Sequence, residues 1–134
     1  TVSGAASGGS IVQSGGTETV ASGGLLTSVG GFGWNGLFGT AVVLAGGSAD
    51  HVYISGGAFN LLGFASAVDV YSGGVENISS GGVLTASSGG GNSVHDNAAL
   101  NVLAGGSAER IYASGAGADV EVAGTAPRGP DGAA

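Results

Sequence analysis

The side chains that could do chemistry in this chain are few and widely spaced. Its 134 residues include two histidines, nine acidic residues, two cations and no cysteine or methionine. Neither His51 nor His95 has a partner at the spacing that a metal site or an activated nucleophile requires. The sequence therefore predicts no metal, no cofactor and no catalytic residue, and we do not expect the chain to be an enzyme.

Carboxylate pairs, which cleave polysaccharides on some β-helical enzymes, are not expected to form here either. Asp50 and Glu109 occupy equivalent places in two copies of an internal repeat, and so do Glu18 and Glu76. If the copies are three windings of a solenoid apart, each pair is separated by about 14 Å at a rise of about 4.8 Å per winding. At that distance the two carboxylates cannot act on one bond.

Net charge limits the partners. The chain carries a formal charge of -7, and Arg110 and Arg128 are its only cations. Nucleic acids require a basic stripe that displaces counterions, so we expect no nucleic-acid partner. No apolar run approaches the roughly 18 residues of a membrane-spanning helix, so we expect no membrane insertion.

The elements that must position these side chains are short. Gly accounts for 31 residues, apolar residues for 43% and charged residues for only 8%. Val, Ile, Leu and Ala occur in runs of two to five that Ser-Gly-Gly sequences separate. This pattern predicts an all-β chain of many short strands joined by tight turns.

An internal repeat organises the strands. Residues 11–26 (IVQSGGTETVASGGLL) align with residues 69–84 (DVYSGGVENISSGGVL) at a shift of 58, and residues 43–57 align with residues 102–116 at a shift of 59. The chain is therefore a tandem duplication, with halves at 11–68 and 69–126. Dividing each half by three gives coils of about 19–20 residues, which is typical of a solenoid. We predict a β-solenoid, or β-helix, of six to seven coils over residues 1–124.

Paired glycines mark the corners of the predicted coils. A glycine accepts positive φ without steric cost, and a preceding Ser can hydrogen-bond the backbone of the bend. Short strands between such corners become stable when successive coils stack and pair their backbones. The predicted turn glycines are Gly15, Gly16, Gly23, Gly24, Gly46, Gly47, Gly56, Gly57, Gly73, Gly74, Gly81, Gly82, Gly105 and Gly106.

Acidic residues recur two positions before a branched aliphatic residue. Glu18 precedes Val20 in this way, and Glu76 precedes Ile78. Residues two apart share a strand face, so we expect the acid to sit at a corner, where its carboxylate reaches water, while the aliphatic side chain enters the core.

Two segments carry a family resemblance. VQSGGTETVASGG at 12–24 and VYSGGVENISSGG at 70–82 resemble the passenger repeats of self-associating autotransporter adhesins of the diffuse-adherence type. The resemblance covers most of residues 7–124. It implies a surface-exposed β-helix, favours a right-handed one, and implies a role in cell aggregation, biofilm formation or attachment, in some members with sugars on Ser or Thr. The sequence holds no translocator barrel and few coils, so a fragment and a small relative are alternatives.

The two halves differ in their aromatic content, because all four Phe and the only Trp lie in the first. The segment 32–38 stands where the second half has residues 91–97. These side chains either fill a wider coil or form an exposed patch that contacts another copy or a host surface. The candidate interaction patch comprises Phe32, Trp34, Leu37, Phe38, Phe59, Leu62 and Phe64.

Self-association has a second possible origin in the coil ends. A solenoid without caps exposes unpaired backbone groups and an apolar cross-section at both ends, and head-to-tail contacts of that kind build filaments. The segment 125–134 contains both Pro residues and is expected to be a tail or linker, or a cover for the last coil.

Together these features predict a non-catalytic, extracellular or cell-surface structural element. Its expected partner is itself, as a homo-oligomer or filament, with host or bacterial surface glycans as further candidates. The alternative is a carbohydrate-binding β-helix that presents Phe32, Trp34 and Phe38 to a glycan.

Overall fold

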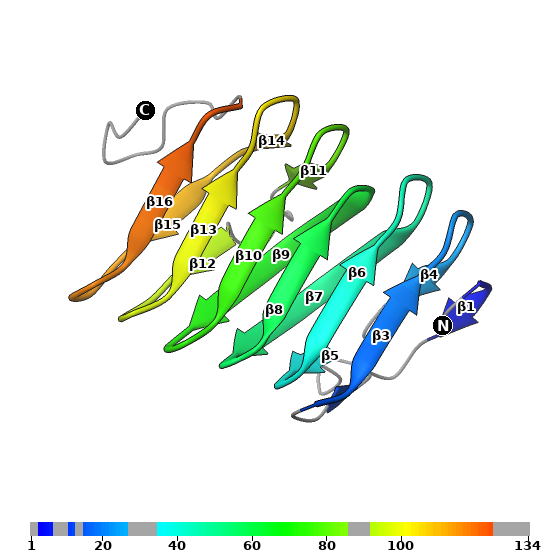
Figure 1. The fold of residues 1–134 in the computed structure, drawn as a ribbon, viewed down its shortest axis with the longest axis horizontal. Coiled ribbons are helices and arrows are strands. Elements are labelled where there is room, and N and C mark those ends of the chain that lie inside the picture. The colour runs from blue at the N-terminus through cyan, green and yellow to red at the C-terminus, as the bar shows by residue number, and fades with distance from the viewer. Residues whose placement is uncertain (1–2, 7–10, 13–14, 27–34, 86–91, 125–134) are drawn as a thin grey trace.

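The computed structural model describes residues 3–6, 11–12, 15–26, 35–85 and 92–124, and this part of the chain contains strands and no helix. The strands form a β-solenoid in two parallel sheets (Figure 1). The predicted all-β solenoid is confirmed.

One sheet contributes a single strand to every coil, and we call it the first face. Neighbouring strands pair in parallel and in register. Six strands correspond to about five complete turns between the first and the last. They are β3 (Thr17–Val20), β6 (Thr40–Val43), β8 (Ala58–Leu61), β10 (Val75–Ile78), β13 (Ala99–Val102) and β16 (Asp119–Val122).

The other sheet has ten strands and is bent into two faces. Its strands are β1 (Ala5–Ala6), β2 (Ile11–Val12), β4 (Leu25–Leu26), β5 (Asn35–Leu37), β7 (Ser48–Ser55), β9 (Phe64–Tyr71), β11 (Val83–Thr85), β12 (Asn92–Val94), β14 (Ser107–Ala108) and β15 (Ile111–Ala113). The second face holds β1, β4, β11, β14 and the first halves of β7 and β9. The third face holds β2, β5, β12, β15 and the second halves of β7 and β9.

Strand register explains the 58-residue repeat. Thr17 on β3 lies three strands from Val75 on β10, and Thr40 on β6 lies three strands from Ala99 on β13. One repeat therefore spans three coils. Individual coils are unequal, because 17 residues separate Ala58 from Val75 and 24 separate Val75 from Ala99.

Glycine pairs turn the chain at two of the three corners. The first glycine of every predicted pair has φ between +73° and +86°. At the corner between the first and second faces, Gly47 N donates to Leu44 O and Gly82 N donates to Ser79 O, which closes a four-residue turn with positive φ at its third residue. We call this the glycine corner.

The second glycine of a pair has another role. A methyl group on Gly106 would stand 2.6 Å from the carbonyl oxygen of Ile78 in the coil below, and one on Gly82 would collide with the carbonyl oxygen of Leu61. These glycines are buried, and they let the backbones of successive coils touch.

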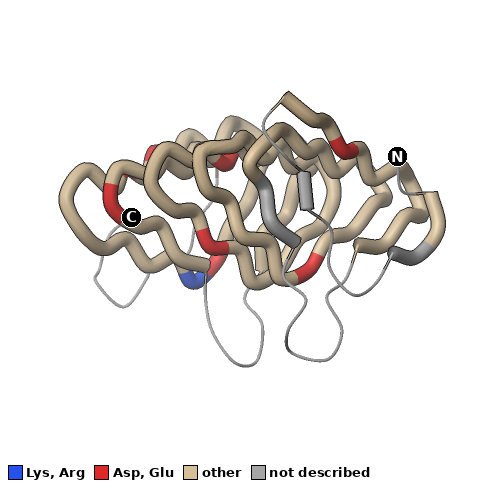
Figure 2. The backbone as a smooth tube through the Cα atoms, turned by 90° about the horizontal axis from the view of Figure 1, so that it is seen from below, with Lys and Arg blue, Asp and Glu red and all other residues tan. Residues whose placement is uncertain are grey.

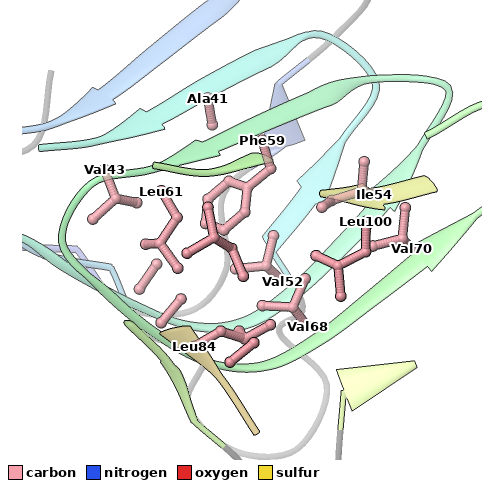
Figure 3. Close-up of a cluster of buried hydrophobic side chains, with 14 of the residues drawn as sticks. Ala41, Val43, Val52, Ile54, Phe59, Leu61, Val68, Val70, Leu84 and Leu100 are labelled. Carbon is pink, nitrogen blue, oxygen red and sulfur yellow. The ribbon is translucent and has the colours of Figure 1, made fainter. Parts of the chain in front are cut away.

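The core fills the space between the three faces. Strands β6, β8, β10 and β13 alternate between half-buried and fully buried side chains, as a strand with one face in water does. Figure 3 shows Phe59, Leu61 and Leu100 from the first face packed against Leu84, Val52 and Val68 from the other two. Aliphatic side chains from every described coil make this one continuous core.

Glu76 departs from the sequence expectation. The pattern predicted a carboxylate at a corner in water, but Glu76 is only 1% exposed and points into the core from the second position of β10. The reason is the strand period of two, which places Glu76 on the same side as the buried Ile78. Glu18, at the same position of β3, is half-buried.

Candidate functional site

The described aromatic residues of the predicted patch, Phe38, Phe59 and Phe64, do not lie together. Phe59 is 1% exposed and packs in the core, so its place in a surface patch is wrong, because it occupies an inward position of β8. Phe38 and Phe64 are each 44% exposed, but they lie at different corners. Phe38 lines a groove of about 400 Å³ between the third and first faces, together with Gly15, Gly56 and Gly73.

Other members of the predicted patch are only partly described. Leu62 is half-buried at the glycine corner beside Phe64. Leu37 lies on β5, and Phe32 and Trp34 lie outside the described residues. Of the seven predicted residues, Leu62 and Phe64 are brought together at one groove.

The glycine corner carries a row of exposed aliphatic and aromatic side chains. Leu25, Leu44, Phe64 and Leu103 are 38–44% exposed and come from four different coils. A groove of about 340 Å³ at this corner is lined by Leu62, Phe64 and Val83, by the glycines of the turns, and by Ser48 and Ser80. The corner is therefore an uncharged edge on which exposed Leu and Phe side chains stand among serines and glycines.

The outward surface of the first face next to this edge is uncharged over four coils. Its middle carries a ladder of amides, in which Asn77 Nδ2 donates to Asn60 Oδ1 at 3.1 Å and Asn101 Nδ2 donates to Asn77 Oδ1 at 2.9 Å. The outward residues of β6, β8, β10 and β13, all half-buried, are Thr40, Val42, Ala58, Asn60, Val75, Asn77, Ala99 and Asn101. We call these residues, with Leu44, Leu62, Phe64 and Leu103, the uncharged side.

Charges lie elsewhere on the described coils. Asp50 and Glu109 are on the second face, Asp69 is on the third face, Asp96 is at the corner between the third and first faces, and Asp119 and Glu121 are on β16, the last strand of the first face. Figure 2 shows how sparsely these acidic positions occur along the backbone. Because the whole chain has a net charge of -7, an uncharged surface of this extent is a distinct feature.

The third face carries an aromatic ladder that the sequence did not single out. Tyr53 stacks on Tyr71 with ring centroids 4.4 Å apart, and Tyr71 stacks on His95 at 4.2 Å. Tyr71 and His95 occupy neighbouring rungs, so the coil spacing itself brings the rings into contact. Since both faces of the Tyr71 ring are covered, this ladder stabilises the stacking of coils and offers no open ring at Tyr71 to a sugar.

Asp69 lies beside this ladder. Partial burial raises the pKa of the Asp69 carboxyl, and the nearby His95 and a hydrogen bond from Ser93 lower it by less. On the second face, Asp50 Oδ1 lies 3.0 Å from His51 Nδ1 and accepts a hydrogen bond from Ser66 Oγ at 2.9 Å. These contacts join neighbouring side chains on the surface of the solenoid.

No constellation for catalysis is assembled within the described residues. Asp50 is three strands from the rung of Glu109, as Glu18 is from Glu76. No group of three His, Asp or Glu side chains in the described ranges could hold a metal ion. Among these residues there is also no helix long and apolar enough to cross a membrane.

Asn92 is a buried polar residue. The sequence showed only that it lies in a segment that differs between the two halves, and gave no sign of its role. Its Oδ1 accepts a hydrogen bond from Val68 N at 3.0 Å, and its Nδ2 donates to Thr85 O at 3.1 Å and to Glu109 O at 2.9 Å. It is 1% exposed. One amide thus joins three successive coils where residues 86–91 separate β11 from β12.

Comparison with solved structures is informative where comparison of sequences is not. No family of known proteins matches the chain, and no curated protein matches it in sequence. A solved structure, the TibC-catalysed, hyper-glycosylated fragment 55–350 of TibA, matches it with a TM-score of 0.66 and 27% identity. The match covers 92% of this chain and 52% of that one, so the chain spans about half the length of the TibA fragment. The fold and this likeness support an autotransporter-adhesin-like passenger repeat.

Proposed function

We propose that this chain is a non-catalytic, cell-surface adhesive segment of the diffuse-adherence type, and that it works by associating with copies of itself. The observation that carries the proposal is the uncharged side, a flat sheet surface whose edge exposes Leu and Phe side chains, on a chain of net charge -7. The likeness to the TibA fragment supports an adhesive role. Aggregation, biofilm formation and attachment would follow from contacts between many such segments.

Charge favours this side over the others. Two copies that meet through the second or third face would bring Asp50, Glu109 or Asp69 near their equivalents, and like charges across an interface oppose association. Contact through β6, β8, β10 and β13 avoids that repulsion. Small and β-branched side chains there, among them Thr40, Val42 and Ala58, also allow close approach of a second sheet.

Area limits the strength of each contact. The four strands β6, β8, β10 and β13, of four residues each, span about 14 Å by 13 Å, or roughly 190 Å². A stable pair of proteins needs about 800 Å² on each partner. We therefore expect a weak contact between two single chains and strong adhesion only where many chains are presented together.

The test is aggregation of beads coated with the chain. Ala58→Glu with Ala99→Glu places two charges on the uncharged side, and Ser55→Glu with Ser114→Glu places two on the third face as a matched control. We expect the first variant to lose aggregation and the control to keep at least half of it. Unchanged aggregation of the first variant, with its β signal in circular dichroism intact, would overturn the proposal.

Head-to-tail stacking of coil ends is the competing route to self-association. Filaments one solenoid wide in negative-stain images, which persist in the Ala58→Glu, Ala99→Glu variant, would support that route in place of the uncharged side. Side-by-side pairs or bundles that this variant loses would support the uncharged side.

Glycan binding is a second candidate because the Phe38 ring is 44% exposed beside a groove. Exposed aromatic rings at a groove are suited to the apolar faces of sugars. Retention of the chain on immobilised polysaccharide should fall at least tenfold in Phe38→Ser, and no change would exclude this ring.

Sugar attachment is a further part of the proposal. The TibA fragment is hyper-glycosylated in a reaction that TibC catalyses. In this chain Ser22, Ser72 and Ser80 are exposed in the glycine turns, where a hydroxyl is accessible without disturbing a strand. Co-expression with TibC and intact-mass measurement should show added sugar units, and Ser→Ala at these three positions should remove them.

A further inference from the structure

Glu76 is the one titratable side chain among the fully buried residues that the structure describes. It lies on β10, near the middle of the solenoid, and its register partners on the neighbouring strands are Phe59 below and Leu100 above. A carboxyl group between two apolar rungs has no neighbour that stabilises a charge.

Apart from Asn92, the buried side chains in the core around Glu76 are apolar. The Oε1 atom of Glu76 is buried and has no hydrogen-bond partner. The other buried polar residue in the described part of the chain, Asn92, is not titratable. The large apolar side chains that point inward from the flanking strands and from the other two faces are Phe59, Leu61, Leu100, Val102, Val52, Ile54, Val68, Val70, Leu84 and Val94.

Charged groups are distant from this carboxyl. Glu18 points inward from β3, three strands away along the same row. Arg110, the cation among the described residues, is exposed beyond the second face. Burial alone accordingly raises the pKa of Glu76 to about 8.

We propose that Glu76 is a proton-dependent joint in the solenoid: the central coil closes tightly over the protonated carboxyl and loosens when the proton is lost. This coil is the element that responds, because Glu76 is buried on the inward side of β10, between the strands β8 and β13 that pair with it. An ionised carboxylate in that core draws in water or forces the strand outward.

The direction of the pH effect follows from proton binding. In the unfolded chain the pKa of a glutamate is about 4.3, so folding takes up a proton at neutral pH. Below about pH 4.3 this group does not change the folding constant. Between that pH and about pH 8 the folding constant falls by about tenfold for each pH unit, and above about pH 8 the group has no further effect. The rod is therefore most stable in mildly acidic surroundings.

Urea unfolding of the full chain between pH 5 and pH 9 tests the proposal. We expect the folding constant of the parent to fall about four-hundredfold from pH 5 to pH 8, and that of Glu76→Gln to fall less than thirtyfold. Asp69→Asn is the matched control, because Asp69 is a half-buried carboxyl with a raised pKa on the surface. It should keep most of the parent slope, and a Glu76→Gln slope equal to that of the parent would overturn the proposal.

A second measurement decides the question even if Glu76→Gln does not fold. The parent can be labelled with ¹³C at the δ carbon of its four glutamates and titrated by NMR. A Glu76 signal that stays protonated at pH 6.5 supports the joint. A signal that titrates near pH 4.3 in the folded protein overturns it.

Discussion

The two corners that bound the second face differ in how much sequence variation they allow. At the glycine corner the backbones of successive coils touch, and Gly47, Gly82 and Gly106 stand where any side chain would meet a carbonyl oxygen or a packed side chain of the coil below. At the corner between the second and third faces, which we call the variable corner, the link between strands changes from coil to coil. One edge of the solenoid is therefore fixed, and another accepts change.

Single residues make the variable corner in three coils. His51, Ala67 and Arg110 occupy it with φ between +52° and +56°, a conformation that glycine tolerates best. In two other coils the flanking strands are further apart in the sequence, because β4 ends at Leu26 and β5 begins at Asn35, and β11 ends at Thr85 and β12 begins at Asn92. The coil lengths of 17 to 24 residues arise mainly at this corner.

Gly82→Ala should break the fixed edge and has the largest expected effect. Its methyl group would collide with the Leu61 carbonyl and lie 3.1 Å from Ile78 Cγ2, so two coils must separate. We expect a loss of about 4 kcal/mol in the free energy of unfolding by urea titration. Gly56→Ala is the control: its methyl group meets nothing within 4 Å, and its φ of +73° should cost only about 1 kcal/mol. Equal losses in the two variants would contradict a rule based on coil contact.

Sequence reasoning could predict the coils because the fixed edge repeats. The glycine pairs and the 58-residue shift indicate strands, turns and three coils per repeat. The second glycine of each pair could not be assigned its role, since close approach between coils depends on which backbone lies below. A glycine required for positive φ and a glycine required for close contact between coils look the same in the sequence.

The variable corner is where prediction from the sequence failed. A constant shift placed Asn92 opposite Gly33, but strand register places it at the position of Asn35, because eight residues precede β5 and six precede β12. The aromatic patch failed for a related reason. Whether Phe59 points in or out depends on its place within a strand of four residues, which composition does not show.

Asn92→Ala should destabilise the variable corner, and its loss of free energy of unfolding should be the second largest. The change removes three hydrogen bonds and leaves the Val68 N–H and the carbonyl groups of Thr85 and Glu109 without their partner. We expect a loss of about 3 kcal/mol in urea unfolding. Asn92→Asp keeps the acceptor for Val68 but no donor, so it should recover little of that loss. Full stability of Asn92→Asp would show that the two donated bonds are unimportant.

Asn77→Ala should weaken the regular first face by about 1 kcal/mol. Asn77 is the middle of the amide ladder and makes two hydrogen bonds, whereas Asn101 donates one to it. The matched variant Asn101→Ala should therefore lose about half as much in the free energy of unfolding. If the two losses are equal, the ladder does not act through its bonds, and burial of the Asn side chains would be the remaining cause.

Arg110→Gly should raise the free energy of unfolding slightly, whereas Gly82→Ala should lower it. Arg110 is exposed and has φ of +52°, so a glycine there relieves about 1 kcal/mol of backbone strain, while the greater freedom of the unfolded chain costs part of that gain. We expect a net gain of about 0.5 kcal/mol, visible as a rise of about 2 °C in the melting temperature followed by circular dichroism. Gly82→Ala and Arg110→Gly are changes in opposite directions at the two corners. A loss of stability in both would mean that the variable corner is as fixed as the glycine corner, and that positive φ at Arg110 is held by contacts of its side chain.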